Sequence, residues 1–370
     1  MRILVATGIF PPQIGGPATY SKLLYDELPK RGIDVEIASF GDHIDKPKLI
    51  RHFLYFLELL KKAPDVDLIY AQDPVSVGLP ALLASQIRGK KLALKIVGDY
   101  AWEQGTQRFG ITDTLDDFAR AYQRYPWQVK VMKKIEKYVA DGASKIIVPS
   151  KYLKGVVSAW GVDPDKIGVI YNGFRAESPK ALRPSLRKKL GLEGGVVVTV
   201  GRLVPWKGMK ELIEAMAEVK KSIPDAKLVV IGDGPERQRL EEAAALSGIA
   251  SDVTFTGRLG QKVLFEYVKA ADAFALNTSY EGFSHQILET MAIGTPVITT
   301  AIGGNPEAIE NGVSGVLLAP NDKAGFAKAI IEILSEKAVA FVYSKEAKKA
   351  VSRFSDEAML ENIARELKTL

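Results

Sequence analysis

"VVVTVGRLVPWKG", residues Val196 to Gly208, begins with five consecutive β-branched residues, which are followed by a glycine and then by two cations. A short run that is apolar on both sides of a strand is typical of parallel sheets, in which helices cover both faces. The polar segment 172–195 precedes it and contains no such run. The stretch therefore indicates that a second set of buried strands begins near residue 196.

Similar runs recur along the chain, and stretches with the spacing of helices separate them. Six begin before the polar segment and six follow its end: 2–7, 35–40, 67–73, 92–98, 145–150, 167–173, 196–202, 227–234, 253–258, 273–279, 296–302 and 315–320. Strands alternating with helices predict two α/β domains, each a doubly wound, Rossmann-like parallel sheet with right-handed crossovers.

We expect the first domain to comprise residues 1–175 together with about 355–370, and the second to comprise 176–354. A helical pattern begins near Lys337, and a final helix follows with Ser355 or Asp356 as its candidate N-cap. This last helix would cross back to the first domain.

The composition is that of an ordinary globular protein, with 47% hydrophobic and 25% charged residues in 370. No segment reaches the roughly 18 apolar residues of a membrane span, and no secretory cleavage site follows the N-terminus, so we expect a cytoplasmic protein. With no cysteine and three scattered histidines, the sequence excludes disulfides, thiolate nucleophiles and His-rich metal cages. The net charge of +6 favours an anionic partner, but no nucleic-acid-binding motif accompanies it.

Ligands of open parallel sheets bind beyond the carboxyl ends of the strands, so functional residues should follow strands directly. Arg202 and Lys207 lie in such a position. A guanidinium and an ammonium together can neutralise a diphosphate, whose negative charge grows when the bond to it breaks. The alternative is that both are solvated surface cations.

A second candidate segment, "EGFSHQILETMAIGTPVITTAIGGNPE", runs from Glu281 to Glu307. It predicts a loop after the strand at 273–279 and a helix starting near Ser284, whose hydroxyl can cap the helix. Glu281 and Glu289 can each accept hydrogen bonds from vicinal sugar hydroxyls. Glu289 stands among apolar neighbours, where an unpaired carboxylate is costly, although a solvated helix residue is the alternative.

The loop after the first strand reads "GIFPPQIGGPATY" and contains Gly15 and Gly16, with Pro17 in a position suited to the first turn of a helix. Glycines allow the backbone to approach a bound group, and a helix start offers N–H donors to an anion. The alternative is an ordinary glycine-rich turn.

Several short motifs of other enzyme classes are absent, incomplete or misplaced in the sequence. The two Asp-x-Asp pairs, at 65–67 and 163–165, precede strands and so lie at the wrong edge of the sheet for a metal-bound nucleotide. The "GDGPER" stretch from Gly232 is an incomplete dinucleotide fingerprint. No P-loop and no nucleophile elbow is present, and we expect no metal and no cofactor.

Taken together, these segments resemble glycosyltransferase family 4, over nearly the whole chain. The marks of the resemblance are "GGPATY", "GRLVPWKG", "EGFSHQILETMAIGTPVI" and "GGNPEAI". It implies the GT-B fold, in which two Rossmann-like domains face each other across a cleft. It also implies a retaining, metal-independent hexosyltransferase that uses a nucleotide diphosphate sugar, such as a UDP- or GDP-sugar, in polysaccharide biosynthesis.

The resemblance also implies roles for individual residues. Arg202 and Lys207 would hold the donor diphosphate, which Gly16, next to Gly15, would approach. Glu289 would bind the nucleotide ribose. Glu281, with the backbone of Gly282, Phe283 and Ser284, would face the donor sugar. Arg258 would lie near the nucleobase.

One position departs from the family pattern. Many members place a histidine just after the fourth strand of the first domain, whereas this chain has Gly98 and Asp99 there. Asp99 is the candidate catalytic substitute, with Trp102 or Glu103 shaping the acceptor side. A helix N-cap is an equal alternative for Asp99.

The acceptor is expected to be a glycan or a polyprenol-linked sugar. The segments 52–62 and 120–140 are basic and aromatic, so they either contact the inner face of an anionic membrane or simply pack on the sheet. Two competing functions remain open at this stage: a sugar-nucleotide-binding protein without catalysis, and a GT-B epimerase or phosphorylase.

Overall fold

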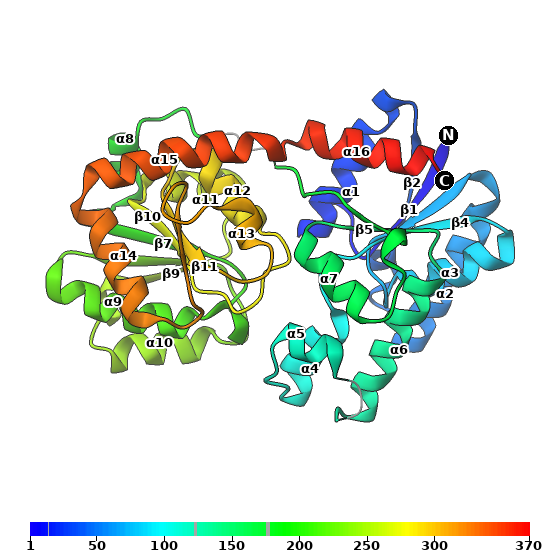
Figure 1. Cartoon of the computed structure of the whole chain (residues 1–370), viewed down its shortest axis with the longest axis horizontal. Coiled ribbons are helices and arrows are strands. Elements are labelled where there is room, and N and C mark those ends of the chain that lie inside the picture. The colour runs from blue at the N-terminus through cyan, green and yellow to red at the C-terminus, as the bar shows by residue number, and fades with distance from the viewer. Residues whose placement is uncertain (14, 122–123, 175–177) are drawn as a thin grey trace. The chain divides into compact units, whose positions relative to one another are not determined.

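The computed structural model describes residues 1–13, 15–121, 124–174 and 178–370 (Figure 1). The chain forms two compact units, one of Met1–Tyr171 with Glu357–Leu370 and the other of Asn172–Asp356. The expected boundary at 175/176 falls on residues 175–177, which lie outside the described residues. The second crossing lies between Asp356 and Glu357, where the sequence analysis put it near residue 355.

The first unit contains a parallel six-stranded sheet in the order β2-β1-β3-β4-β5-β6. Its strands are β1 (Arg2–Thr7), β2 (Asp34–Ser39), β3 (Leu68–Ala71), β4 (Lys91–Lys95), β5 (Lys145–Val148) and β6 (Ile167–Val169). Its helices are α1 (Gly16–Glu27), α2 (Lys48–Lys62), α3 (Gly78–Arg88), α4 (Tyr100–Phe109), α5 (Leu115–Arg120), α6 (Trp127–Gly142), α7 (Lys151–Ala159) and α16 (Asp356–Lys368).

The strand order determines which helices share a face of this sheet. The connection β1–α1–β2 runs in one direction along the sheet, while the connections through α2, α3, α6 and α7 run in the other. Right-handed crossovers therefore place α1 on one face and the other four helices on the opposite face. Met359, Ile363 and Leu367 of α16 share a buried cluster with Ile3 and Leu24, so the last helix covers the α1 face. The predicted return of the C-terminal helix to the first domain is confirmed.

The second unit contains another parallel six-stranded sheet, in the order β12-β11-β10-β7-β8-β9. Its strands are β7 (Val196–Val200), β8 (Lys227–Ile231), β9 (Val253–Gly257), β10 (Ala273–Leu276), β11 (Val297–Thr300) and β12 (Val316–Leu318). Its helices are α8 (Arg183–Leu190), α9 (Met209–Ser222), α10 (Arg237–Leu246), α11 (Gln261–Ala270), α12 (His285–Ile293), α13 (Asn305–Ala308), α14 (Lys323–Ser335) and α15 (Lys337–Val351).

Each of the twelve apolar runs overlaps one of these strands, and β7 is buried at all five positions. The agreement has a physical reason, because strands covered on both faces need apolar side chains at consecutive positions. The predicted helix near Lys337 is α15, and α16 begins at Asp356. Within the described ranges, no helix combines the length and the apolar character needed to cross a membrane.

Candidate functional site

The centre of the second sheet brings three loops together. Strand β10 lies between β7 and β11, and all three run parallel, so their carboxyl ends meet at one edge. The loops that leave this edge are 201–208, 277–284 and 301–304. They contain the Arg-Lys pair, the first glutamate and the Gly-Gly pair of the sequence analysis.

The first two loops are joined by hydrogen bonds to one backbone carbonyl. The carbonyl of Trp206 accepts hydrogen bonds from the amide of Ser279 at 2.8 Å and from the hydroxyl of Thr278 at 3.1 Å. Gly208 has a φ of 55°, and a Cβ there would come within 1.9 Å of the carbonyl oxygen of Asn277. Only glycine fits this position, which fixes Lys207 in a one-turn 3₁₀ helix, Pro205–Lys207, beside the β10 loop.

Lys207 and Glu281 meet as a consequence. The Nζ of Lys207 lies 2.5 Å from Oε2 of Glu281, and each side chain is only 14% exposed. The structure thus joins two predicted site residues from different loops in one partly buried ion pair. The attraction between two charges shielded from water is screened less than that of a surface pair, and removing one partner leaves the other charge uncompensated.

The Gly-Gly pair supports the Glu281 loop. The amide of Gly304 donates to the carbonyl of Glu281 at 3.0 Å. A Cβ on Gly303 would come within 1.9 Å of that same carbonyl, and one on Gly304 within 2.3 Å of the carbonyl of Gly282. The glycines are therefore needed for close packing of two loops, a role that the sequence alone did not show, since it requires knowing that β10 and β11 are neighbours.

A second glycine pair supports the loop that carries Arg202. Added Cβ atoms on Gly232 and Gly234 would come within 1.9 Å and 2.3 Å of the carbonyls of Gly201 and Leu203. The amide of Leu203 donates to the carbonyl of Asp233 at 3.1 Å. The incomplete dinucleotide fingerprint is thus a turn after β8 that packs under the β7 loop. Arg202 itself is exposed, as is Arg258 after β9.

Helix α12 begins directly after the Glu281 loop. Ser284 occupies the N-cap position, as predicted, but its hydroxyl bonds Oε1 of Gln286 at 3.2 Å and makes no capping bond. The predicted capping role of this hydroxyl is wrong, because a neighbouring side chain competes for it. The amides of a first helical turn have no intrahelical acceptor, so this helix start suits an anionic or hydroxyl-bearing ligand.

Glu289 lies one and a half turns into α12 and is partly buried. Burial raises the pKa of its carboxyl to about 7, with the charge of Asp356 adding to the rise and a hydrogen bond from Gln261 opposing it. Glu289 is thus more enclosed than a solvated surface residue of a helix, which was the alternative interpretation of this position. Gln261, its partner at the start of α11, had no signal in the sequence, because it is distant along the chain.

Phe283 has two separate environments. Its ring is 5% exposed and packs edge-on against Phe354, with the ring centroids 5.1 Å apart. Its carbonyl accepts a hydrogen bond from Nδ2 of Asn172 at 3.4 Å. The side chain therefore belongs to the core of the second unit, and only backbone groups of Gly282, Phe283 and Ser284 remain candidates for ligand contact, as expected.

In the first unit, the glycine-rich loop leads into α1. Gly15 is the N-cap residue, Gly16 is the first helical residue, and Pro17 is the second rather than the first. Among the described residues, no atom outside its chain neighbours and its own helix backbone lies within 4 Å of a Cβ built on Gly16. The loop has the form expected of an anion-binding helix start.

Asp99 is completely buried and is the N-cap of α4. Its carboxylate accepts hydrogen bonds from the amide of Trp102 at 2.7 Å and from Nε1 of Trp160 at 3.1 Å. Burial raises the pKa of this carboxyl to about 6, although these hydrogen bonds and the charge of Lys133 oppose the rise. The N-cap alternative is confirmed, since one carboxylate oxygen caps α4, while the other accepts from Trp160 at the end of α7.

Glu136 is a buried carboxyl that the sequence analysis missed. Its Oε1 accepts from the amides of Tyr100 and Ala101 at 2.7 Å and 3.3 Å, while its Oε2 is buried without a hydrogen bond. Burial, reinforced by the charge of Asp99, raises its pKa well above the ordinary range. A signal was available, since Glu136 is in helical register with the apolar residues Val129 and Ala140. Two carboxyl groups thus hold the start of α4.

Metal ligands do not gather in the described parts of the chain. No group of three or more histidine, aspartate or glutamate side chains there is arranged to hold a metal ion. The cationic groups of Arg202 and Lys207 are the candidates for balancing the charge of a diphosphate.

Comparison with known proteins connects this geometry to a family. The family model described as Glycosyltransferase Family 4 matches residues 14–178, and the model described as Glycosyl transferases group 1 matches residues 183–350. The chain belongs to the family 4, or group 1, glycosyltransferases. As a glycosyltransferase it is an enzyme, and its two sheets are those of the GT-B fold.

Individual relatives of this glycosyltransferase are distant. An uncharacterised glycosyltransferase of Methanocaldococcus jannaschii is 27% identical, over 91% of this chain and 90% of its own length. A D-inositol 3-phosphate glycosyltransferase of Frankia alni is 31% identical, but over only 54% of this chain and 53% of that one. The Anabaena protein HepE, solved with UDP and glucose, has the same fold, with a TM-score of 0.80, 22% identity and 100% coverage of both chains.

Proposed function

We propose that this glycosyltransferase moves a hexosyl unit from a nucleoside diphosphate sugar to a hydroxyl of a glycan or polyprenol-linked acceptor, with retention of configuration and without a metal. The observation that carries the proposal is the Lys207–Glu281 ion pair, which lies where β7 and β10 end and α12 begins. A cation, a carboxylate and a helix start at one strand edge suit a diphosphate joined to a polyol.

In the proposed reaction the bond between the sugar C1 and the diphosphate oxygen breaks, and the negative charge on the diphosphate increases. Lys207 and Arg202 supply the compensating positive charge, which stabilises the leaving group. The acceptor oxygen then bonds to C1 on the same face, and its proton passes to the departing phosphate oxygen. Atoms and charge balance without a metal or a redox partner.

The ion pair gives Glu281 and Lys207 two states. Without donor, the two side chains neutralise each other. With donor bound, the ammonium of Lys207 turns to the diphosphate, and the carboxylate of Glu281 accepts a hydrogen bond from a sugar hydroxyl. The backbone of Gly282 and Ser284 contributes further polar groups beside that sugar.

Glu289 is assigned to the ribose of the donor nucleotide, whose vicinal hydroxyls can donate to both of its carboxylate oxygens. The turn at Gly257 and Arg258 is assigned to the nucleobase. The helix start at Gly16, after Gly15, stays a separate candidate for an anionic group. The names of relatives support a nucleotide sugar as donor, since HepE was solved with UDP and glucose. UDP- and GDP-sugars are the donors to test first.

The first experiment measures the melting temperature of the purified full chain against a panel of nucleotide sugars, because a bound donor stabilises the folded state by mass action. The nucleotide sugar that raises the melting temperature is then the substrate in assays of its slow hydrolysis and of sugar transfer, both with EDTA present. We expect both reactions in EDTA, and their loss in Lys207→Ala.

The matched control is Lys210→Ala, which removes an exposed lysine of the same segment that pairs with Glu214. It should retain full activity. Donor binding without hydrolysis or transfer would instead favour a sugar-nucleotide-binding protein, and a changed sugar without transfer would favour an epimerase. Activity that disappears with EDTA and returns with a divalent metal would contradict the metal-independent mechanism.

A further inference from the structure

Three helices of the first unit, α2, α3 and α6, carry apolar side chains on the side that faces away from the sheet. We propose that this surface, the α2–α3–α6 face, docks on an anionic lipid bilayer. It is defined by these exposed residues: Leu49, Ile50, Phe53, Leu57, Leu83, Ile87, Trp127, Val131 and Tyr138. The inference goes beyond the proposed transfer reaction and does not depend on it.

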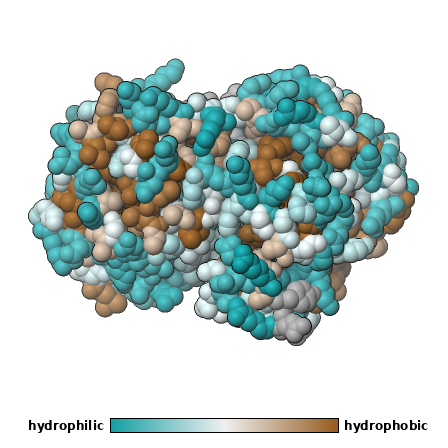
Figure 2. Space-filling model, in the orientation of Figure 1, coloured by the Kyte–Doolittle hydropathy of each residue, from teal (hydrophilic) through white to brown (hydrophobic). Residues whose placement is uncertain are grey.

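The three helices form one continuous layer. Right-handed crossovers place all of them on the same face of the first sheet, and α3 contacts both α2 and α6. Their sheet-facing sides are buried, so their opposite sides point outward together. In Figure 2, hydrophobic residues interrupt the hydrophilic surface at the edge of the first unit formed by α2 and α3.

Helix α2 is apolar on two sides. Tyr55 and Leu59 are completely buried against the domain, as a helix covering a sheet requires. Leu49 and Phe53 are 86% and 60% exposed, and Leu57 continues their line at the next helical turn. The outer side of a helix in a soluble domain is ordinarily polar, so this second apolar stripe needs a partner.

Helices α3 and α6 repeat the pattern. Leu83 and Ile87 are one helical turn apart on α3, and Ile87 is 61% exposed. Trp127, 71% exposed, lies one turn before Val131 on α6, and Tyr138 follows on the same side. Tryptophan and tyrosine at the border of an apolar surface are typical of side chains that lie at the headgroup level of a membrane.

The charges around this face favour an anionic partner. Acidic side chains of the three helices are buried or neutralised: Glu58 pairs with Lys62 and His43, Glu136 is buried, and Asp141 pairs with Lys137. Helix α3 has no acidic residue.

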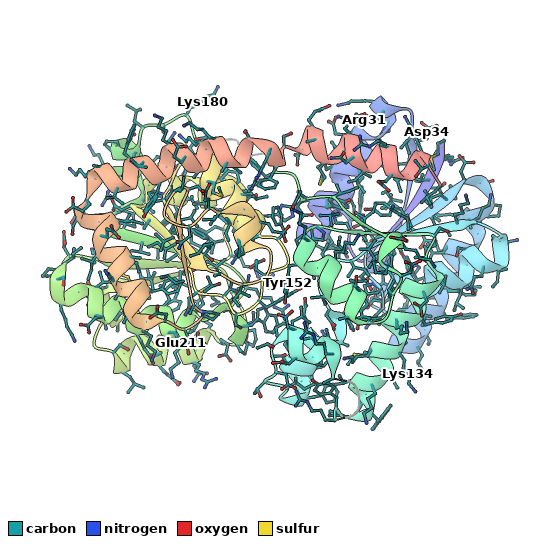
Figure 3. The ribbon with its side chains drawn as sticks, viewed as in Figure 1. Arg31, Asp34, Lys134, Tyr152, Lys180 and Glu211 are labelled. Carbon is teal, nitrogen blue, oxygen red and sulfur yellow. The ribbon has the colours of Figure 1, made fainter. Side chains whose placement is uncertain are left out.

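The cations of the same helices include several without an acidic partner. Among the described residues, Lys61, Lys130 and Lys134 form no ion pair, and Lys134 is labelled on α6 in Figure 3. The face thus combines apolar side chains with cations that form no ion pair, which complements a bilayer that contains anionic lipids. A second copy of the chain would bring the same cations to a symmetric contact, and the like charges would repel.

The test is co-sedimentation of the purified full chain with vesicles of phosphatidylcholine alone and of phosphatidylcholine with phosphatidylglycerol. We expect binding to the anionic vesicles, at least tenfold weaker binding to the neutral ones, and weakening by salt. The double variant Leu49→Asp/Phe53→Asp should lose tenfold or more of the binding, and Lys130→Glu/Lys134→Glu should lose binding to the anionic vesicles.

Phe341→Asp, at an exposed apolar position of α15 in the second unit, is the control, and its vesicle binding should be unchanged. The melting temperature shows whether each variant folds. The rise in melting temperature when a nucleotide sugar is added shows separately whether the donor site still binds. Equal binding by the wild-type chain and the Leu49/Phe53 variant, or no binding of the wild-type chain to anionic vesicles, would overturn the proposal. A dimer that this variant abolishes would also overturn it and would assign the face to self-association.

Discussion

Lys207 and Glu281 lie 74 positions apart in the chain, yet their charged groups are 2.5 Å apart in the folded second unit. The contact exists because β7 and β10 are adjacent strands with parallel directions, so their loops leave the sheet side by side. The ion pair places a competing carboxylate on the lysine that we assign to the diphosphate.

Replacing Glu281 by glutamine should separate binding of the diphosphate from transfer. Glu281→Gln removes the carboxylate that competes for Lys207, so free UDP or GDP, whichever matches the donor, should bind severalfold more tightly. Transfer should fall by two orders of magnitude or more, since the neutral amide orients the donor sugar less well. Calorimetric titration and initial rates provide the two measurements. Weaker binding of the free nucleotide by this variant would contradict the competition.

Gly303→Ala should be far more damaging than alanine at another glycine with positive φ. Gly303 has a φ of 61°, and its new Cβ would meet the Glu281 carbonyl at 1.9 Å. We expect the free energy of unfolding to fall by more than about 2 kcal/mol. Gly312→Ala is the matched control, because Gly312 has a φ of 75° and open space around it, and should cost only about 1 kcal/mol. Urea denaturation compares them, and equal costs would show that the loop can move aside.

Nucleotide binding should depend on pH through Glu289, whose pKa is raised to about 7 by burial. Ribose hydroxyls donate to the ionised carboxylate, so the nucleotide should bind more weakly as pH falls below about 7. Glu289→Gln should bind weakly at every pH and lose this dependence. Titrations between pH 5.5 and 8.5 test the prediction, and an identical pH profile in the variant would exclude Glu289 from the ribose site.

Glu289 should also make the stability of the fold depend on pH, and here a lower pH should be favourable. Because the pKa of Glu289 is higher in the folded state than the ordinary 4.5, folding favours the protonated carboxyl. Its stabilising contribution is complete below about pH 4.5 and is lost as pH rises through about 7, with a slope of up to ~1.4 kcal/mol per pH unit. Glu289→Gln should flatten that part of the profile of unfolding free energy against pH. An unchanged slope would indicate an ordinary pKa.

Glu136 should tolerate glutamine and not alanine. Burial raises the pKa of its carboxyl well above the ordinary range, which favours the protonated form, and Oε1 accepts two amide hydrogen bonds at the start of α4. Glu136→Gln preserves that acceptor, so the free energy of unfolding at pH 7 should change by less than about 1 kcal/mol. Glu136→Ala removes an acceptor shared by two amides at the start of α4 and should cost about 2 kcal/mol or more. A glutamine variant as unstable as the alanine variant would show that the negative charge itself is needed.

The amino-acid sequence by itself determined the elements of this protein. Runs such as 196–200 are β-branched at consecutive positions, a local property that reports burial on both faces of a sheet. The polar segment before residue 196 and the helical pattern at the C-terminus likewise indicated two units and a returning last helix. The family resemblance predicted Lys207, Glu281 and Glu289 as site residues, because each stands in a characteristic short motif.

Only the tertiary structure decided which of these residues meet. The pairing of Lys207 with Glu281 and the packing of Gly303 against the Glu281 loop both follow from the strand order β11-β10-β7. The local pattern carries no information on that order, because any arrangement of equally apolar strands would bury the same side chains. The N-cap role of Asp99 and the outward apolar side of α2 were likewise resolved by burial, which depends on the neighbours that folding supplies.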